Sequence, residues 1–255
     1  MKYKNILLTG ALGELGRAIS SSKIFPHLLA PSREILDITK PDTIKKFFGN
    51  NDFDAIIHCA ALARIWECEE NPIKAIETNI VGTSNLVNEV LKKEEASKKK
   101  IRFIHISTDV VYPGTKGDYS ENDETIPFNV YGWTKLGAEC AVHALSDFCI
   151  IRTSFFDSEK IEFDDAAVDA YSSKVPVSYF VNSVSVLLNR GFVGIINVGR
   201  EKKSDYEHYR EFKPDIKKCR LEDIQKRIPF RLYKDASMDC SLWKKMDKEN
   251  EAIKK

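Results

Sequence analysis

The stretch TGALGELG, residues 9–16, follows the apolar run KNILLT, residues 4–9, and precedes a segment whose apolar residues recur at helical spacing. This pattern predicts a buried strand that ends at Gly10 and a helix over residues 13–21. Glycine lets the backbone turn tightly, and the start of a helix offers free N–H groups and a favourable dipole to an anion such as pyrophosphate. Because the spacing is GxxGxxG rather than GxGxxG, a turn that serves only close helix packing is the alternative interpretation.

Strand and helix signals continue to alternate along the chain. Further strands are expected at residues 27–30, 34–38, 54–59, 101–106, 148–152 and 193–198. Further helices are expected at residues 41–48, 72–93, 130–145 and 181–188, with short ones near 204–211 and 221–227. Strands that alternate with helices indicate βαβ units and hence a parallel sheet of the α/β class.

Composition excludes several classes of protein. The 255 residues include 39 basic and 38 acidic side chains, and this balance is not that of a nucleic-acid-binding protein. No apolar stretch approaches the roughly 20 residues of a membrane span, and no secretory signal is recognisable. The six cysteines form no CxxC pair, so we expect no metal site. Free thiols and a cytoplasmic location are the corresponding expectations.

A second motif, YGWTK at residues 131–135, lies on the helix expected at 130–145. Tyr131 and Lys135 are four residues apart and therefore share one helix face. The pKa of a phenol is about 10, and a neighbouring ammonium group lowers it, so the pair predicts an acid–base site. A pair of this kind also occurs by chance on helix surfaces, and its position after the strand at 101–106 favours the functional interpretation.

A third motif, STDVVYPG at residues 107–114, follows the strand at 101–106. Ligands of open α/β sheets bind outside the carboxyl ends of the strands. A hydroxyl group at this place can bind the carbonyl oxygen of a substrate. Ordinary capping of a strand end by Ser107 and Thr108 is the alternative.

These motifs together resemble the extended short-chain dehydrogenase/reductase family, and within it most closely the dTDP-4-dehydrorhamnose reductase group. The resemblance rests on STDVVYPG (107–114), YSENDETIPFNVYGWTKLGAE (119–139) and IIRTS (150–154), with support from LDIT (36–39), HCAA (58–61) and GIINVG (194–199). It is firm over residues 4–155 and looser beyond, where DASMDCSLWKK (235–245) is similar to the group's C-terminal segment. The resemblance implies a Rossmann-like, doubly wound parallel sheet with a small C-terminal substrate lobe.

The resemblance also implies roles for individual residues. Tyr131 is expected to give a proton to the reduced carbonyl, Lys135 to hold the nicotinamide ribose and lower the Tyr131 pKa, and Thr108, rather than Ser107, to orient the carbonyl oxygen. The expected cofactor-binding residues are Gly10, Leu12, Gly13, Glu14, Leu15, Gly16, Ser32, Arg33, Asp37, Ile38, Ala60, Ala61, Leu62, Tyr131 and Lys135. The expected substrate contacts are Thr108, Asp109 and Phe155.

The choice of cofactor depends on the end of the second expected strand. An acidic residue there favours NADH by binding the ribose hydroxyls. Here the chain reads PSR at residues 31–33, with no acid before Glu34. Because Arg33 can pair with a 2′-phosphate, we expect NADPH to be preferred over NADH. A loop arginine in solvent is the alternative for Arg33.

The expected organisation is an NAD(P)-binding domain at residues 1–153 and a sugar-nucleotide-binding lobe at 154–255, with residues 181–198 joining the main domain. The expected activity is NAD(P)H-dependent reduction of a nucleotide-activated 4-keto-6-deoxy sugar for polysaccharide biosynthesis. The expected partners are the nucleotide sugar and a second copy in a homodimer, with no nucleic acid and no membrane. The lobe residues expected to grip the nucleotide are Phe155, Phe156, Tyr206, Tyr209, Arg210 and Arg231.

Two alternatives stay open within the same superfamily. One is a sugar-nucleotide epimerase or dehydratase, and the other is a non-catalytic NADP-binding regulatory subunit similar to that of methionine adenosyltransferase. The chain also departs from the reductase group in two ways. Phe155 stands where many relatives have tryptophan, and the stretch after Phe156 is shorter, so the sequence leaves the identity of the sugar open.

Overall fold

The computed structural model describes residues 2–25 and 27–253, and its centre is a parallel β-sheet. The six strands lie in the order β10-β5-β4-β3-β1-β2. Their bounds are β1 (Ile6–Thr9), β2 (Leu28–Leu29), β3 (Ala55–His58), β4 (Arg102–Ile106), β5 (Phe148–Thr153) and β10 (Gly194–Val198). Because β1 lies between β2 and β3, the strand order reverses there, and a crevice opens at the carboxyl edge. The Rossmann-like α/β class expected from the sequence is confirmed.

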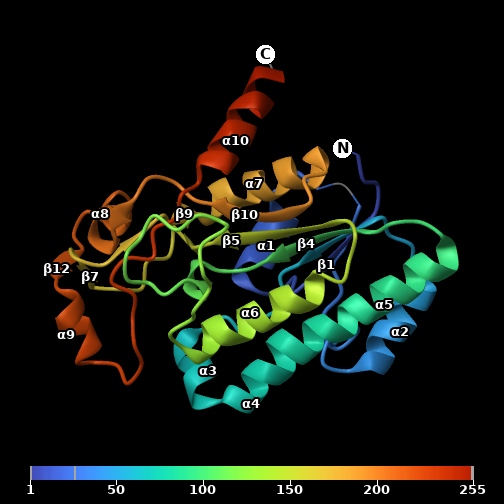
Figure 1. Ribbon diagram of the computed structural model, residues 1–255, viewed down its shortest axis with the longest axis horizontal. Coiled ribbons are helices and arrows are strands. Elements are labelled where there is room, and N and C mark those ends of the chain that lie inside the picture. Colours follow the sequence, from blue (N-terminus) through green and yellow to red (C-terminus); the bar gives the residue numbers. More distant parts are fainter. Residues whose placement is uncertain (1, 26, 254–255) are drawn as a thin grey trace.

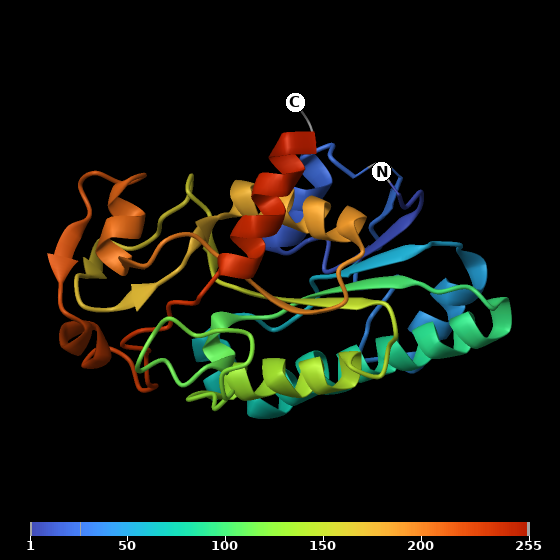
Figure 2. The same cartoon turned by 45° about the horizontal axis from the view of Figure 1, so that its top comes forward.

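Helices cover both faces of the sheet (Figures 1 and 2). One layer contains α1 (Glu14–Ser21), α7 (Val177–Arg190) and α10 (Ser241–Ile253). The other contains α2 (Pro41–Asn50), α5 (Gly82–Ser97) and α6 (Val130–Val142), joined at one end by α3 (Ile65–Glu70), α4 (Pro72–Ala75) and the π-helical turn η1 (Ile76–Val81). The expected helix at 72–93 is therefore present, and it continues to Ser97.

Alternation of side chains along the strands produces two separate cores. In β1, Ile6 and Leu8 pack with Phe180 and Val184 of α7, whereas Leu7 packs with Ile44, Leu86 and other residues of the α2 and α5 layer. Each strand of the interior is buried on both faces, as the near-continuous apolar runs predict.

The segments after β5 build a lobe beyond the carboxyl edge, at the left of Figure 1. It contains β6 (Phe155–Phe156), β7 (Asp165–Ala167), β8 (Tyr171–Ser172), β9 (Val175–Pro176), β11 (Lys203–Ser204), α8 (Asp205–Arg210), β12 (Lys217–Cys219) and α9 (Leu221–Gln225). Its strands pair only two by two, as β6 with β9, β7 with β12 and β8 with β11. The expected lobe range ends with residues 254–255, which lie outside the described residues.

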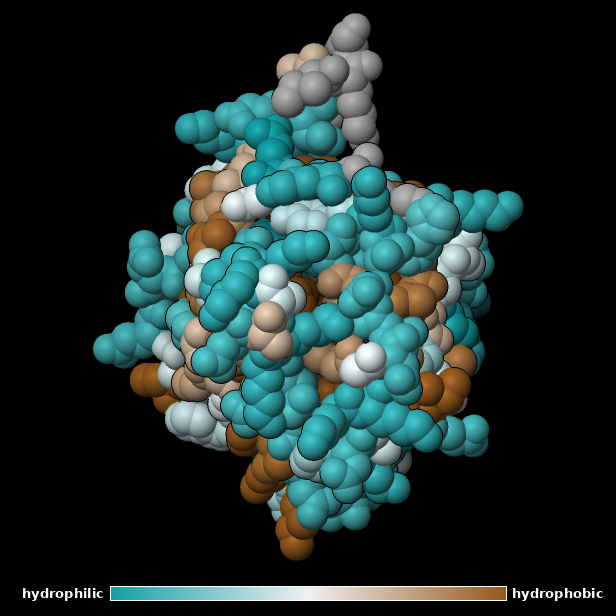
Figure 3. Space-filling view, turned by 90° about the vertical axis from the view of Figure 1, so that its right-hand side faces the viewer, coloured by the Kyte–Doolittle hydropathy of each residue, from teal (hydrophilic) through white to brown (hydrophobic). Residues whose placement is uncertain are grey.

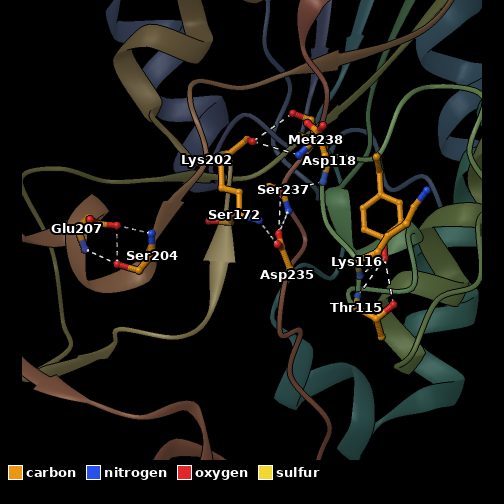
Figure 4. A network of polar contacts seen from close by, with 12 residues as sticks. Thr115, Lys116, Asp118, Ser172, Lys202, Ser204, Glu207, Asp235, Ser237 and Met238 are labelled. Carbon is orange, nitrogen blue, oxygen red and sulfur yellow. Dashed lines mark hydrogen bonds and ion pairs between the residues drawn. The ribbon is translucent and has the colours of Figure 1, made fainter.

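A polar network joins the lobe to the loop that follows β4 (Figure 4). The Ser237 hydroxyl accepts from the Asp118 backbone N–H (2.9 Å) and donates to Asp235 Oδ1 (2.6 Å). Lys202 forms an ion pair with the other oxygen of Asp235. Gly117 has φ +72°, and a Cβ there would lie 2.2 Å from Asp235 Cγ, so this approach requires glycine.

The prediction of a strand at residues 34–38 is wrong. The backbone N–H groups of Ile35 and Leu36 both donate to the Ser32 carbonyl, so the chain turns at this point. Leu36 and Ile38 are buried nevertheless, because the turn packs against the α2 and α5 layer. The alternation of apolar residues that indicated a strand therefore reflects the burial of Leu36 and Ile38 in an irregular segment.

The molecular surface is predominantly polar on the face at the right of Figure 1, where hydrophilic residues dominate (Figure 3). Among the described residues, no helix has the length and apolar character needed to cross a membrane.

A buried ion pair ties α6 to the sheet. Arg152 of β5 donates from Nε and Nη2 to the two oxygens of Glu139 on α6, at 3.1 and 2.7 Å. The Ser107 hydroxyl donates to the same carboxylate, and Arg152 Nη1 donates to the Tyr112 hydroxyl (2.9 Å). Glu139 and Arg152 are 2% and 3% exposed, so neither charge has water as an alternative partner.

We expect Glu139→Ala to destabilise the fold by about 3–5 kcal/mol, because it leaves the Arg152 charge buried without a counter-ion. Urea unfolding followed by circular dichroism measures the change. Glu162→Ala removes a carboxylate from the exposed Lys160–Glu162 pair and serves as the control, with no change expected. A Glu139→Ala protein as stable as this control would contradict the assignment.

Candidate functional site

The glycine-rich turn lines a pocket of about 200 Å³ at the point where the strand order reverses. Gly10 has φ +70°, and a Cβ there would lie 2.6 Å from the Ala60 backbone nitrogen. A Cβ on Gly16 would lie 2.1 Å from the Gly10 carbonyl oxygen. Gly13 caps α1 without a side-chain bond, so N–H groups of the first helical turn are free for an anion. The turn therefore fits a dinucleotide, whose pyrophosphate requires close approach of the backbone.

The structure brings many of the expected cofactor residues into this pocket. Its lining includes Gly10, Leu12, Gly13, Arg33, Asp37, Ile38, Ala60 and Ala61, together with Thr9, Cys59 and Thr78. The expected residues outside the lining are Glu14, Leu15, Gly16, Ser32, Leu62, Tyr131 and Lys135. Leu15 is buried in the core and Gly16 sits under the turn, so both act through packing.

Arg33 and Asp37 face one another at the mouth of the pocket. Arg33 Nε donates to Asp37 Oδ2 (3.1 Å), and Thr39 donates to Asp37 Oδ1 from its backbone N–H (3.0 Å) and its hydroxyl (2.7 Å). These bonds hold the pKa of Asp37 below its usual value despite burial. Since both carboxylate oxygens are engaged within the protein, Asp37 supports the loop, whereas the largely exposed Arg33 faces solvent at the pocket.

Thr108 and Asp109 stand at the carboxyl end of β4, where the chain forms the short helix η2 (Asp109–Val111). The Thr108 hydroxyl accepts from the Val110 backbone N–H (3.2 Å) and donates to Asp109 Oδ1 (3.1 Å). Both residues are buried, and burial raises the pKa of Asp109 to about 7. Ser107 directs its hydroxyl to Glu139 instead, so it is not available to a ligand.

Tyr131 and Lys135 lie on the first turns of α6. Asn129 caps the helix by accepting from the Gly132 backbone N–H (2.8 Å), and Glu69 of α3 accepts from the Val130 N–H (2.8 Å). These contacts fix the helix start, and Thr108 lies beside the Tyr131 phenol, where it acts to lower the pKa of that group. The three residues expected to be catalytic therefore lie at one edge of the sheet.

Other partners hold Lys135 in this structure, and its expected effect on the pKa of Tyr131 stays a prediction. Burial raises the pKa of Tyr131, and the Asp109 charge raises it further, against the effect of Thr108. Lys135 Nζ instead donates to the Ile106 carbonyl (2.7 Å) and lies 3.5 Å from His105 Nε2. Burial lowers the pKa of Lys135 to about 8, so this ammonium group is itself easily deprotonated.

Successive side chains of a strand point to opposite faces, so Phe155 and Phe156 of β6 have different surroundings. The ring of Phe155 stacks on Phe180 of α7 at 5.5 Å, within the packing of the main core. Phe156 points the other way, where its ring makes T-shaped contacts with Tyr209 and Phe212 of the lobe. These contacts of Phe155 are those of a packing residue, and its expected contact with the substrate stays a prediction.

Sequence reasoning missed Asn79, which is 1% exposed within the π-helical turn. Asn79 Oδ1 accepts from the Leu62 N–H (2.8 Å), and its Nδ2 donates to the Leu62 carbonyl (3.0 Å) and to Thr134 (2.9 Å). It thereby holds the loop after β3 against α6. An asparagine inside an expected helix carries no signal of such a role, because its partners are distant in sequence.

Sequence reasoning also missed Lys174, in the loop between β8 and β9. Lys174 Nζ donates to Asp205 Oδ1 (2.6 Å) and to the Tyr209 hydroxyl (3.1 Å) of α8. Its charge also lowers the pKa of Asp109 against the effect of burial. Lys174 therefore links the lobe to the end of β4.

A larger cavity of about 360 Å³ lies between the lobe and the α7–α10 layer. Its lining includes four basic side chains (Lys174, Arg200, Lys203 and Lys244), two acidic ones (Glu201 and Glu211) and the rings of Phe156, Tyr179 and Phe212. Arg200 stacks over Tyr179 at 4.6 Å. Of the lobe residues expected to grip a nucleotide, Phe156 lines this cavity, whereas Arg210 and Arg231 lie over the rings of Tyr206 and Phe128.

Within the described residues, no cluster of three or more histidine, cysteine, aspartate or glutamate side chains is arranged to hold a metal ion. The six cysteines are free thiols.

Comparison with known proteins gives a family and a set of similar folds. Residues 4–177 match the family described as the RmlD substrate binding domain. A dTDP-4-dehydrorhamnose reductase of Mycolicibacterium smegmatis is 34% identical over 157 residues, which are 60% of this chain and 46% of the relative. The chain thus aligns with about half the length of the curated relatives it matches.

Two solved structures share the fold over nearly the whole chain. A dTDP-4-dehydrorhamnose reductase of Clostridium acetobutylicum superposes with a TM-score of 0.82 at 24% identity, covering 98% of this chain and 99% of the other. A dTDP-4-dehydrorhamnose reductase of Bacillus anthracis in complex with NADP gives a TM-score of 0.80 at 21% identity, covering 92% and 90%. Both likenesses extend through the lobe.

Proposed function

The chain belongs to the RmlD substrate binding domain family, and from this premise we propose that it reduces a keto group of a nucleotide-activated sugar with NADPH. One observation carries the proposal. Tyr131 lies beside Thr108 at the carboxyl end of β4, with Lys135 one turn further along α6. The same edge of the sheet carries the glycine-lined pocket, so an acid group and a dinucleotide site adjoin.

The residues present fit a nicotinamide dinucleotide. The backbone of Gly10 and Gly13 with the start of α1 would hold the pyrophosphate, and Ala60 and Ala61 would border it after β3. When bound, the cofactor supplies a hydride to the carbonyl carbon. Lys135 uses one N–H for the Ile106 carbonyl and lies 3.5 Å from His105 Nε2, which leaves at least one N–H for a ribose hydroxyl.

The chain's own part in the reaction is proton donation and orientation. A carbonyl oxygen placed beside Tyr131 receives its phenolic proton as negative charge develops. The raised pKa of Tyr131 keeps the hydroxyl protonated at neutral pH, which suits a donor. Thr108 lies beside the hydroxyl, and the buried edge of the sheet excludes water from the reacting atoms.

We expect Tyr131→Phe to retain NADPH binding and to lose turnover by roughly 10²–10⁴-fold, because the proton donor is absent. NADPH oxidation is followed at 340 nm with a panel of nucleotide keto sugars, and cofactor binding is measured by calorimetry. Near-wild-type turnover of Tyr131→Phe would refute the assignment.

The same assay on the wild-type protein separates the competing functions. NADPH oxidation with a keto sugar supports the reductase. A changed sugar without net oxidation supports an epimerase or dehydratase, and NADPH binding without any conversion supports a regulatory subunit. Retention of Thr108, Tyr131 and Lys135 in one constellation favours catalysis.

We expect Arg33→Ala to weaken NADPH by roughly tenfold and to leave NADH unchanged, because only NADPH carries the 2′-phosphate that a guanidinium group can pair with. Titration of both cofactors by fluorescence checks this. Lys46→Ala, which removes an exposed basic side chain from α2, is the control. Equal weakening of both cofactors would show that Arg33 does not select NADPH.

We further propose that the larger cavity anchors the diphosphate and base of the nucleotide sugar. Basic side chains outnumber acidic ones in its lining, and the rings of Phe156 and Tyr179 offer faces for stacking. Lys174 lines this cavity, and its charge also acts on Asp109 at the end of β4. The cavity therefore lies near the end of β4. We therefore keep the division expected from the sequence as a proposal, with residues 1–153 binding the cofactor and residues 154–255 binding the sugar nucleotide.

We expect Arg200→Gln and Lys244→Gln each to weaken nucleoside diphosphate binding by roughly tenfold while NADPH binding stays unchanged. Calorimetry with dTDP and UDP measures both, and Lys226→Gln on α9 is the control. Point variants are needed because truncation would remove Trp243 of α10, which is 1% exposed and donates to the Tyr179 hydroxyl (3.0 Å). Unchanged binding in both variants would place the nucleotide elsewhere.

A further inference from the structure

Two histidine side chains lie next to one another in the interior of the sheet, and the proposed reduction uses neither. His58 of β3 and His105 of β4 are opposite one another in the register of the strands, and their ring centroids are 5.4 Å apart. They are 1% and 0% exposed. The two nitrogens of His58 lie at hydrogen-bond distance from the hydroxyl groups of Thr9 (2.7 Å) and Thr83 (3.0 Å). The polar atoms of His58 are therefore satisfied, and its ring ties β1 and β3 to α5.

His105 has different surroundings. Its Nε2 lies 3.5 Å from Lys135 Nζ, and its Nδ1 has no hydrogen-bond partner among the described residues. A buried nitrogen without a partner is costly, and an apolar side chain at this strand position would avoid the cost. Packing alone therefore does not account for a histidine here. The polar contact that the imidazole adds is the one with Lys135.

This contact has a defined direction. The ammonium group of Lys135 has three protons and no lone pair, so the ring nitrogen that faces it must be the acceptor. The proton of the neutral ring then resides on Nδ1. Burial holds the pKa of His105 well below its ordinary value, and Lys135 and His58 act in the same direction, so the ring stays neutral.

Lys135 Nζ is thus held between two acceptors that are neighbours in β4, the Ile106 carbonyl at 2.7 Å and the His105 ring. The carboxylate of Glu139, one turn further along α6, is occupied on both oxygens by Arg152. Because Lys135 is 4% exposed, water offers little replacement for the two acceptors. The charged form of Lys135 therefore depends on them.

The titratable groups that face Lys135 come from three elements. They are Glu139 on α6 itself, His58 of β3 with Cys59 directly after it, and His105 of β4. Burial lowers the pKa of Lys135 to about 8, while Glu139 and Cys59 act to raise it. The side chain is therefore charged at neutral pH and loses its proton as the pH rises through about 8.

We propose that His105 is a positioning residue whose Nε2 accepts from the Lys135 ammonium group, keeps it charged and directs it toward the ribose of the bound cofactor. The inference rests on the proposed function, in which Lys135 binds a ribose hydroxyl. Loss of the Lys135 proton removes the cation, so cofactor affinity is full below the Lys135 pKa and falls as the pH rises through it. Without the His105 acceptor the ammonium form is less favoured, and this fall moves to lower pH.

Titration of Lys135 tests the contact without substrate or cofactor. Protein labelled with ¹³C at lysine Cε is titrated by NMR, and the Lys135 signal is identified by its loss in Lys135→Met. The signal should titrate near pH 8 in the wild-type protein. His105→Leu and His105→Phe both remove the acceptor, so each should lower this midpoint by about one pH unit. His105→Gln keeps an acceptor oxygen and should restore the midpoint.

His143→Leu is the matched control, because it removes an exposed imidazole from the C-terminal end of α6. It should leave the Lys135 midpoint unchanged. A midpoint that stays in place or rises in His105→Leu and His105→Phe overturns the proposal. Failure of both variants to fold while His143→Leu stays folded, followed by circular dichroism, also overturns it, because His105 would then be a structural residue.

Calorimetric measurement of NADPH binding against pH tests the role toward the cofactor. Affinity should fall above about pH 8 in the wild-type protein and about one pH unit earlier in His105→Leu. His105→Gln and His143→Leu should behave as the wild-type protein does. An unchanged binding profile in a variant whose lysine signal has moved overturns the positioning role. A moved lysine signal in a protein that binds no NADPH supports the contact between His105 and Lys135 and overturns the proposed reductase instead.

Discussion

The ion pair between Glu139 and Arg152 is the contact on which the arrangement of the candidate site depends. Its carboxylate also accepts from Ser107, so one buried group joins α6, β5 and the end of β4. Tyr131 and Lys135 lie on the same helix as Glu139, and Thr108 follows Ser107 directly. The position of the acid group relative to the strand edge is therefore set by this pair. Because both charges have lost their water, any shift of α6 would leave one of them unpaired.

The same network continues toward the lobe. The Tyr112 hydroxyl receives a hydrogen bond from Arg152 and donates to Asn197 Oδ1 (2.9 Å), and Asn197 Nδ2 donates to the Tyr119 carbonyl (2.9 Å). Tyr112 and Tyr119 stack at 4.8 Å. The loop after β4 is thus held between β10 and the main site, and the lobe is attached to that loop through Asp235 and Ser237. A chain of polar contacts thus links the Glu139–Arg152 pair to the loop that holds the lobe.

Burial shapes the charges of this region in a uniform way. The pKa of His58 falls to about 3 and that of Lys135 to about 8, whereas that of Asp109 rises to about 7, and desolvation is the largest cause of each change. Burial therefore disfavours the charged form of each of these three groups. An anionic dinucleotide or diphosphate entering the edge would change these balances, which couples binding to the protonation of the site.

The sequence by itself determined the parallel sheet, the strand–turn–helix at residues 9–16 and the placement of Thr108, Tyr131 and Lys135 at one edge. These features follow from local periodicity, from glycine spacing and from the rule that parallel strands end together. Only the tertiary structure decided that residues 34–38 turn rather than form a strand, that Phe155 packs against Phe180, and that Lys135 bonds Ile106. It also revealed Asn79 and Lys174 as parts of the site. The physical reason is that burial and hydrogen-bond partners are set by groups far apart in the chain, which no local pattern of residues can specify.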